Sequence, residues 1–135
     1  MPNPLDLADQ ATILVVDDSP DIRNLMVAVL EDDYKVMAAN GGEEAIKFAL
    51  SDTPPDLILL DVMMPGMSGY DVCRQLKENP RSCDIPVFFL SAMAGDGNKA
   101  QGLALGAVDY LTKPLVPAIM MARVKGFFIA HPKRR

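Results

Sequence analysis

The chain has 135 residues, half of them hydrophobic, and a formal net charge of −5 at pH 7. This length suits a single domain with its own hydrophobic core, and no apolar run reaches the roughly 20 residues that a membrane helix requires. The acidic charge argues against direct nucleic-acid binding, which uses a basic face. The start of the chain is acidic and broken by prolines, which is not typical of a signal peptide. We therefore expect one domain over residues 1–135, with a core at about 11–130, flexible termini and a cytoplasmic location.

The cysteine and histidine content excludes two kinds of scaffold. Cys73 and Cys83 are the only cysteines, and His131 is the only histidine. Two cysteines do not make a disulfide framework, so we expect reduced thiols. A structural zinc site needs more Cys or His ligands than the chain offers.

Short apolar runs alternate with longer segments that have helical spacing. The predicted strands are Thr12–Val16, Tyr34–Ala39, Leu57–Leu60, Val87–Leu90 and Val108–Leu111. The predicted helices are about Pro20–Glu31, Gly42–Ser51, Gly69–Glu78, Asp96–Leu105 and Val116–Ala130. Pro20 suits a first helical turn, with Asp18 or Ser19 as the N-cap. Five repeats of strand and helix predict an α/β fold, with a doubly wound parallel sheet and helices on both faces.

Polar residues follow the apolar runs at the points where the strands end. Asp17 and Asp18 follow the first strand, Asp61 the third and Ser91 the fourth, and Lys113 lies just beyond the fifth. In an open parallel sheet the carboxyl ends of the strands form the ligand-binding edge. Three carboxylates gathered there would repel one another, and oxygen ligands of this kind suit Mg²⁺. An aspartate beside such an ion can attack a phosphoryl group to form an acyl phosphate.

Each of these residues also has a simpler interpretation. Asp17 and Asp18 precede Ser19-Pro20 and could serve only to cap a helix. Ser91 taken alone is typical of a loop hydroxyl, and Lys113 of a solvated charge. Their joint order along the chain is what favours a phosphoryl-transfer site.

The chain resembles the receiver domains of bacterial two-component response regulators. The resemblance extends over roughly Ala11 to Ala130 and rests on four motifs, "ILVVDDSPDIR", "PDLILLDVMMPGMSGYDVCRQLK", "IPVFFLSA" and "GAVDYLTKPL". It implies a five-stranded, flavodoxin-like sheet of order 2-1-3-4-5. It also implies a signalling phosphoacceptor domain that catalyses its own phosphorylation and dephosphorylation, and not a conventional enzyme.

The resemblance assigns roles to individual residues. Asp61 would be the phosphoacceptor, and Asp17 and Asp18 the acidic pair that organises Mg²⁺. Asp18 and Asp61 would ligate the metal through their side chains, and Met63 through its backbone carbonyl.

A second set of implied roles concerns the response to phosphorylation. Ser91 occupies the position of the family's switch hydroxyl and Tyr110 that of its switch aromatic, while Lys113 matches the active-site lysine. The bond between Lys113 and Pro114 would be cis. A histidine kinase, a phosphotransfer protein or a small donor would supply the phosphoryl group to Asp61. Phosphorylation would then repack the face formed by the fourth helix, fifth strand and fifth helix.

Rival functions fit the sequence less well. A haloacid-dehalogenase-like phosphatase carries a second aspartate two positions after its nucleophile, where this chain has Met63. A flavodoxin has a phosphate loop rich in hydroxyls and glycines after the first strand, whereas "DDSPD" would repel a phosphate. A receiver-like module that is never phosphorylated would not need the complete set of acidic, hydroxyl and lysine residues.

Two further hypotheses concern apolar side chains. Met63 and Met93 flank the expected phosphoryl site and would hinder an attacking water, although ordinary gap-filling methionines would look the same. In the last helix, Met120, Met121, Val124 and Phe128 form one stripe and Ile119, Phe127 and Ala130 form another. Only one stripe can face the sheet, and exposed apolar patches mark interfaces. We therefore expect Ile119 and Phe127 to dock a second protomer or an output domain.

Overall fold

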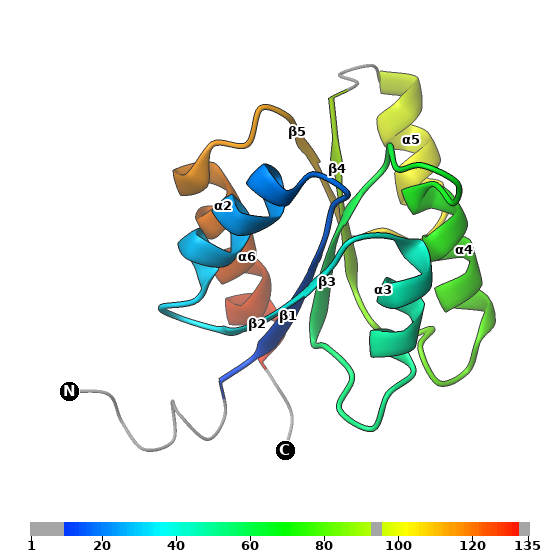
Figure 1. Cartoon of the computed structure of the whole chain (residues 1–135), viewed down its shortest axis with the longest axis horizontal. Coiled ribbons are helices and arrows are strands. Elements are labelled where there is room, and N and C mark those ends of the chain that lie inside the picture. Colours follow the sequence, from blue (N-terminus) through cyan, green and yellow to red (C-terminus); the bar gives the residue numbers. More distant parts are fainter. Residues whose placement is uncertain (1–9, 93–95, 133–135) are drawn as a thin grey trace.

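The computed structural model describes residues 10–92 and 96–132, which form a parallel sheet between two layers of helices (Figure 1). The strands are β1 (Thr12–Val16), β2 (Lys35–Ala39), β3 (Leu57–Asp61), β4 (Val87–Ser91) and β5 (Asp109–Thr112). The helices are α2 (Pro20–Leu30), α3 (Gly42–Ala49), α4 (Gly69–Glu78), α5 (Asp96–Ala104) and α6 (Pro117–Ala130). Every element predicted from the sequence is present, with ends that differ by at most two residues.

The five strands lie in the order β2-β1-β3-β4-β5 and pair in parallel throughout, which confirms the predicted fold class. The strands β3 and β4 each end one residue later than predicted, so that Asp61 and Ser91 belong to the strands themselves. The register pairs Asp61 with Leu90 and Ser91 with Thr112. The polar residues therefore stand side by side at the carboxyl edge of the sheet.

Local signals explain where the helices begin. Ser19 is the N-cap of α2, where its side chain accepts a hydrogen bond from the Ile22 N–H at 3.4 Å, and Pro20 opens the helix. Ser68 and Asp71 form a capping box at the start of α4, each bonding to the backbone N–H of the other. Such caps satisfy N–H groups that the first helical turn leaves without partners.

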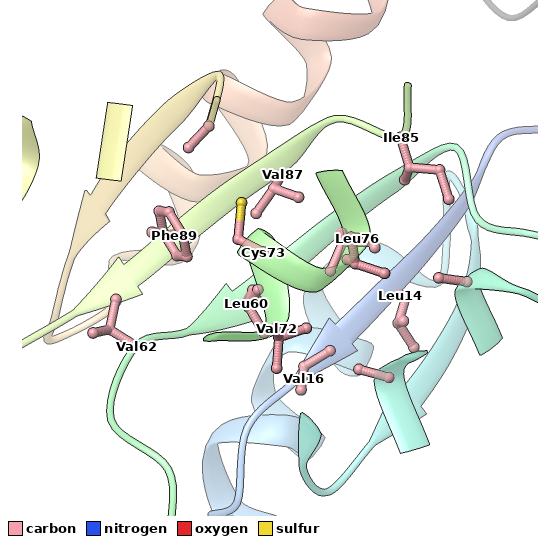
Figure 2. Packing of buried hydrophobic residues seen from close by; sticks show 14 of the residues in the cluster. Leu14, Val16, Leu60, Val62, Val72, Cys73, Leu76, Ile85, Val87 and Phe89 are labelled. Carbon is pink, nitrogen blue, oxygen red and sulfur yellow. The ribbon is translucent and has the colours of Figure 1, made fainter. Parts of the chain in front are cut away.

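The core consists of two apolar layers because side chains alternate across each strand. On one face Leu14 and Val16 of β1 pack with Leu60, Val72 and Phe89, as seen in Figure 2. Helices α3, α4 and α5 cover this face, and α2 and α6 cover the other (Figure 1). The opposite layer contains the intervening residues of β1 together with Met26, Leu30, Met120 and Val124. All five residues of β3 are buried, and β3 is the central strand of the sheet. It therefore holds its last residue, Asp61, at the middle of the carboxyl edge.

The last helix differs in part from its prediction. Met120 and Val124 are buried as expected, and Ile119 is 53% exposed. Phe127, expected on an uncovered stripe, is half-buried and packs edge-on against Phe88, with ring centroids 5.7 Å apart. The expectation of a wholly uncovered second stripe is therefore wrong for Phe127, because the helix faces the sheet over a wider arc than one stripe.

Three remaining expectations concern the ends, the membrane and the cysteines. The predicted flexible termini, residues 1–9 and 133–135, lie outside the described residues. Among the helices of the described segments, none is both long and apolar enough to cross a membrane. Cys73 and Cys83 are both free thiols, the first of them buried.

Candidate functional site

Three carboxylates meet at the carboxyl edge of the sheet. Asp17 and Asp18 directly follow β1, and Asp61 ends the neighbouring strand β3. One carboxylate oxygen from each lies within 4.8 Å of those of the other two. Asp17 is 1% exposed and Asp61 3% exposed, whereas Asp18 faces solvent. The cluster is therefore buried on the protein side and open on the other.

Lys113 bridges two of these carboxylates. Its Nζ lies 3.0 Å from Asp17 Oδ2 and 3.1 Å from Asp61 Oδ1, although the residues come from three separate segments of the chain. Lys113 directly follows β5, and its backbone N–H donates to the Ser91 carbonyl oxygen at 2.7 Å. The peptide bond between Lys113 and Pro114 is cis, as the resemblance implies.

Backbone groups fix the two buried carboxylates. The Ser19 N–H donates to Asp17 Oδ1 at 2.9 Å, and the Met63 N–H donates to Asp61 Oδ1 at 3.3 Å. Arg23 donates from its guanidinium to the Asp17 carbonyl oxygen at 2.8 Å, which ties α2 to the end of β1. Buried carboxylates of this kind keep one orientation because several donors hold them.

The electrostatics of the site follow from burial and proximity. Burial, and then repulsion from Asp17, raise the pKa of Asp61, although contact with Lys113 offsets part of the rise. Burial alone would lower the pKa of Lys113, but its contacts with Asp17 and Asp61 leave that pKa above its ordinary value. Lys113 therefore keeps its positive charge at neutral pH.

The donor set fits a hard divalent cation. The three carboxylates supply only oxygen atoms, and one of them, Asp18, is open to solvent. Mg²⁺ favours one or two carboxylates together with water and phosphate oxygens. The acidic cluster could thus hold such an ion.

The family model for the response regulator receiver domain matches residues 13–125. The chain belongs to this family. The response regulator PleD of Caulobacter vibrioides is 47% identical over 116 residues, which are 85% of this chain and 25% of PleD. The chain spans between about a quarter and a half of the length of its curated relatives.

Solved structures agree with this membership. A putative response regulator from Chloroflexus aurantiacus superposes with a TM-score of 0.82 at 33% identity, covering 89% of this chain and 98% of the other. The BeF3-activated receiver domain of DrrB from Thermotoga maritima gives a TM-score of 0.79 at 33% identity, with 89% and 98% coverage. Residues 13–125 therefore form a receiver domain, a type of signalling domain.

The other residues singled out in the sequence are distributed around the acidic cluster. Ser91 is fully buried at the end of β4, and Tyr110 is buried in β5. Met63 is 66% exposed, so it does not fill a gap in the core of this receiver domain. Met93 lies outside the described residues.

Two residues near the site were not identified from the sequence. Gly69, the first residue of α4, donates its N–H to the Val62 carbonyl at 2.9 Å, and a Cβ there would overlap the backbone carbonyl of Asp61. Tyr70, the next residue, has its hydroxyl 3.1 Å from that of Tyr110. The "SGYD" sequence signals a helix start, but nothing in it reveals either contact.

Proposed function

We propose that Asp61 of this receiver domain accepts a phosphoryl group from a histidine kinase or a phosphotransfer protein, in a reaction that the domain itself catalyses. The proposal rests on one observation above all, the bridge from Lys113 to both Asp17 and Asp61 beside the solvent-facing Asp18. A structural ion pair alone would not require a third carboxylate that opens to solvent.

The chemistry would proceed at the Asp61 carboxylate. One of its oxygens forms a bond to phosphorus while the bond from phosphorus to the donor nitrogen breaks, and the electron pair leaves with that nitrogen. The Lys113 ammonium and the Ser91 hydroxyl are the groups that would stabilise the transferred oxygens, because phosphoryl transfer depends chiefly on positioning and charge. Hydrolysis of the acyl phosphate by water would then return Asp61 to its starting state.

The proposed cofactor is Mg²⁺, held by Asp18 and Asp61, with Asp17 shaping the acidic site and the Met63 backbone carbonyl as a further ligand. When bound, the ion supplies positive charge that offsets the phosphoryl oxygens. The residues of the chain provide the rest: they orient the carboxylate, keep Lys113 protonated and shield one side of the site from water.

The switch would pass from Ser91 to the face formed by α5, β5 and α6. Ser91 and Tyr110 lie on adjacent strands, and the register places Tyr110 opposite Phe89, two residues before Ser91. Side chains two residues apart point to the same face of a sheet. A movement of Ser91 toward a phosphoryl group would thus alter packing around Tyr110.

Intact mass spectrometry tests the phosphoacceptor. After incubation with Mg²⁺ and acetyl phosphate, the wild type should gain about 80 Da, the mass of one phosphoryl group. Asp61→Asn should show no gain, and the matched variant Asp84→Asn, which alters an exposed aspartate, should gain it as the wild type does. A gain that persists in Asp61→Asn would contradict the assignment, as would no gain in the wild type from either acetyl phosphate or a phosphorylated histidine kinase.

We further propose that the α6 side of this face docks a second protomer or an output domain. Ile119 is 53% exposed beside a hollow of about 200 Å³ that Tyr110, Val116 and Arg123 also line. Arg123 is held there by Asp109, with two contacts of 2.8 Å. Phe127, the other residue expected to dock, is half-buried and packs against Phe88 of the sheet.

Sedimentation of the phosphorylated protein tests the second-protomer form of this proposal. Ile119→Glu should weaken self-association, whereas Ile129→Glu should not, although Ile129 is even more exposed at 80%. Equal effects of the two substitutions would contradict a specific role for Ile119. A phosphorylated wild type that stays monomeric would contradict docking of a second protomer, and binding of an output domain to this surface would then be tested.

A further inference from the structure

Two tyrosine hydroxyl groups meet beneath the proposed switch face. Tyr70 is the second residue of α4 and Tyr110 lies in β5, and their hydroxyl oxygens are 3.1 Å apart. Tyr110 is 7% exposed, so its ring points inward. The contact joins a helix that starts next to the Asp61 backbone to the strand that carries the switch aromatic.

The surroundings of the pair are shaped to receive the Tyr110 ring. Phe89 packs edge-on against Tyr70 at 5.0 Å and lies 6.1 Å from the ring of Tyr110. A Cβ at Gly102 of α5 would lie only 2.9 Å from a Phe89 ring carbon and 3.0 Å from a Tyr110 ring carbon. The absence of a side chain at Gly102 thus leaves the space that the inward ring occupies.

We propose that Tyr70 is a positioning residue for Tyr110, and that its hydroxyl holds the Tyr110 ring inward before Asp61 is phosphorylated. The inference rests on the proposed function, in which Tyr110 is the switch aromatic. It adds that the inward arrangement of this chain depends on a hydroxyl from α4. Phosphorylation would then reinforce an arrangement that this hydrogen bond already favours.

The physical basis is that this hydrogen bond is partly shielded from water. Burial, and then the bond to Tyr110, raise the pKa of Tyr70, so its hydroxyl keeps its proton at neutral pH. Turning the Tyr110 ring outward breaks the bond and withdraws its ring from Phe89. A hydrogen bond that is partly shielded from water still favours the arrangement in which it forms. Substitution by phenylalanine removes this bond and retains the ring.

Nuclear magnetic resonance with ring-¹³C tyrosine tests the proposal. The chain has three tyrosines, so single phenylalanine variants of Tyr34, Tyr70 and Tyr110 assign every ring signal. A nuclear Overhauser effect between the Tyr110 ring and the Gly102 α protons reports the inward position. It is measured without Mg²⁺ or a phosphodonor, so the result does not depend on Asp61 chemistry.

The expected result is a clear Overhauser effect in the wild type that weakens in Tyr70→Phe. The inward-to-outward ratio should fall about five-fold, which corresponds to about 1 kcal/mol. Tyr34→Phe is the matched control, since Tyr34 packs against Phe128 on the other face, and it should leave the effect unchanged. An unchanged effect in Tyr70→Phe, or no effect in the wild type, would overturn the proposal.

A second step separates this inference from the proposed function. Adding Mg²⁺ and acetyl phosphate to Tyr70→Phe should restore the Overhauser effect, since phosphorylation favours the same ring position. A variant that gains the phosphoryl group on Asp61 and still lacks the effect would overturn the claim that phosphorylation favours the same inward position. A wild type that shows the effect and gains no phosphoryl group from either acetyl phosphate or a phosphorylated histidine kinase would instead overturn the proposed function alone.

Discussion

Replacing Lys113 by methionine should destabilise the domain by an amount that depends on pH and on Mg²⁺. Methionine retains the unbranched stem and removes the ammonium group. In the native structure that group lies 3.0 Å from Asp17 and 3.1 Å from Asp61, and its side chain is only 21% exposed. Its removal leaves two buried carboxylates without the cation between them.

The expected magnitude follows from these distances. At an effective dielectric constant near 20, unit charges 3 Å apart attract by roughly 5 kcal/mol, and desolvation offsets much of this. Removing one partner of a buried ion pair costs about 3–5 kcal/mol. Because Lys113 keeps some exposure, we expect a loss of about 3 kcal/mol at pH 7.

The pH dependence has a definite sign. Burial and Asp17 raise the pKa of Asp61 in the folded state, so ionisation of Asp61 opposes folding. The associated stability is present below the pKa of the unfolded chain and is lost as pH rises through the folded value. Without Lys113 the folded pKa of Asp61 rises further. The deficit of the variant should therefore grow between about pH 4 and pH 7.

Urea unfolding at several pH values, with and without Mg²⁺, measures this deficit. The matched control is Lys125→Met, because Lys125 pairs with Asp33 at 3.6 Å with both side chains about half exposed. Such a surface pair contributes roughly 0–1 kcal/mol. Saturating Mg²⁺ should shrink the deficit of Lys113→Met and leave the control unchanged. A deficit no larger than that of the control, or one independent of pH, would refute the reasoning.

Three shorter predictions follow from single contacts. Gly69→Ala should lower the unfolding free energy by about 3 kcal/mol, because its Cβ meets backbone. Gly41→Ala has open space around it and should cost no more than about 1 kcal/mol in the same urea titration, the usual loss when alanine replaces a preferred N-cap residue. Met63→Asn should shorten the lifetime of the phosphorylated protein several-fold, as measured by intact mass spectrometry over time. An unchanged lifetime would contradict the hypothesis that the exposed Met63 side chain shields the phosphoryl group from water. At pH 8 iodoacetamide should modify Cys83 and spare Cys73, because burial raises the pKa of the Cys73 thiol; equal modification would argue against this.

The fold could be predicted because its signals are local or depend only on the alternation of side chains. The third and fourth strands are apolar runs buried on both faces, which is typical of central parallel strands. Their positions along the chain also predicted which residues would reach the carboxyl edge. On that basis we expected Asp17, Asp61 and Lys113 to lie together. In the structure both carboxylates lie within hydrogen-bonding distance of the Lys113 ammonium group.

The contacts that could not be predicted depend on side-chain directions across elements distant in sequence. Tyr70 and Tyr110 are 40 residues apart, and no periodicity relates them. Phe127 was expected on an uncovered stripe, yet it contacts Phe88. Helical spacing shows which residues share a face, but it does not show how closely the helix packs on the sheet. The clash at Gly69 depends on how closely α4 approaches the end of β3.

The charge balance at the sheet edge explains why the proposed site would respond to phosphorylation. Lys113 and one divalent cation carry together as much positive charge as the three carboxylates carry negative charge. A phosphoryl group on Asp61 replaces a single negative charge with about −1.5 to −2 at neutral pH. The added charge lies in a site whose protein side is buried, where an uncompensated charge is costly. Additional hydrogen-bond donors must therefore approach it. Ser91 can supply a hydroxyl, since it is fully buried and directly follows Leu90, the residue that pairs with Asp61 on the adjacent strand.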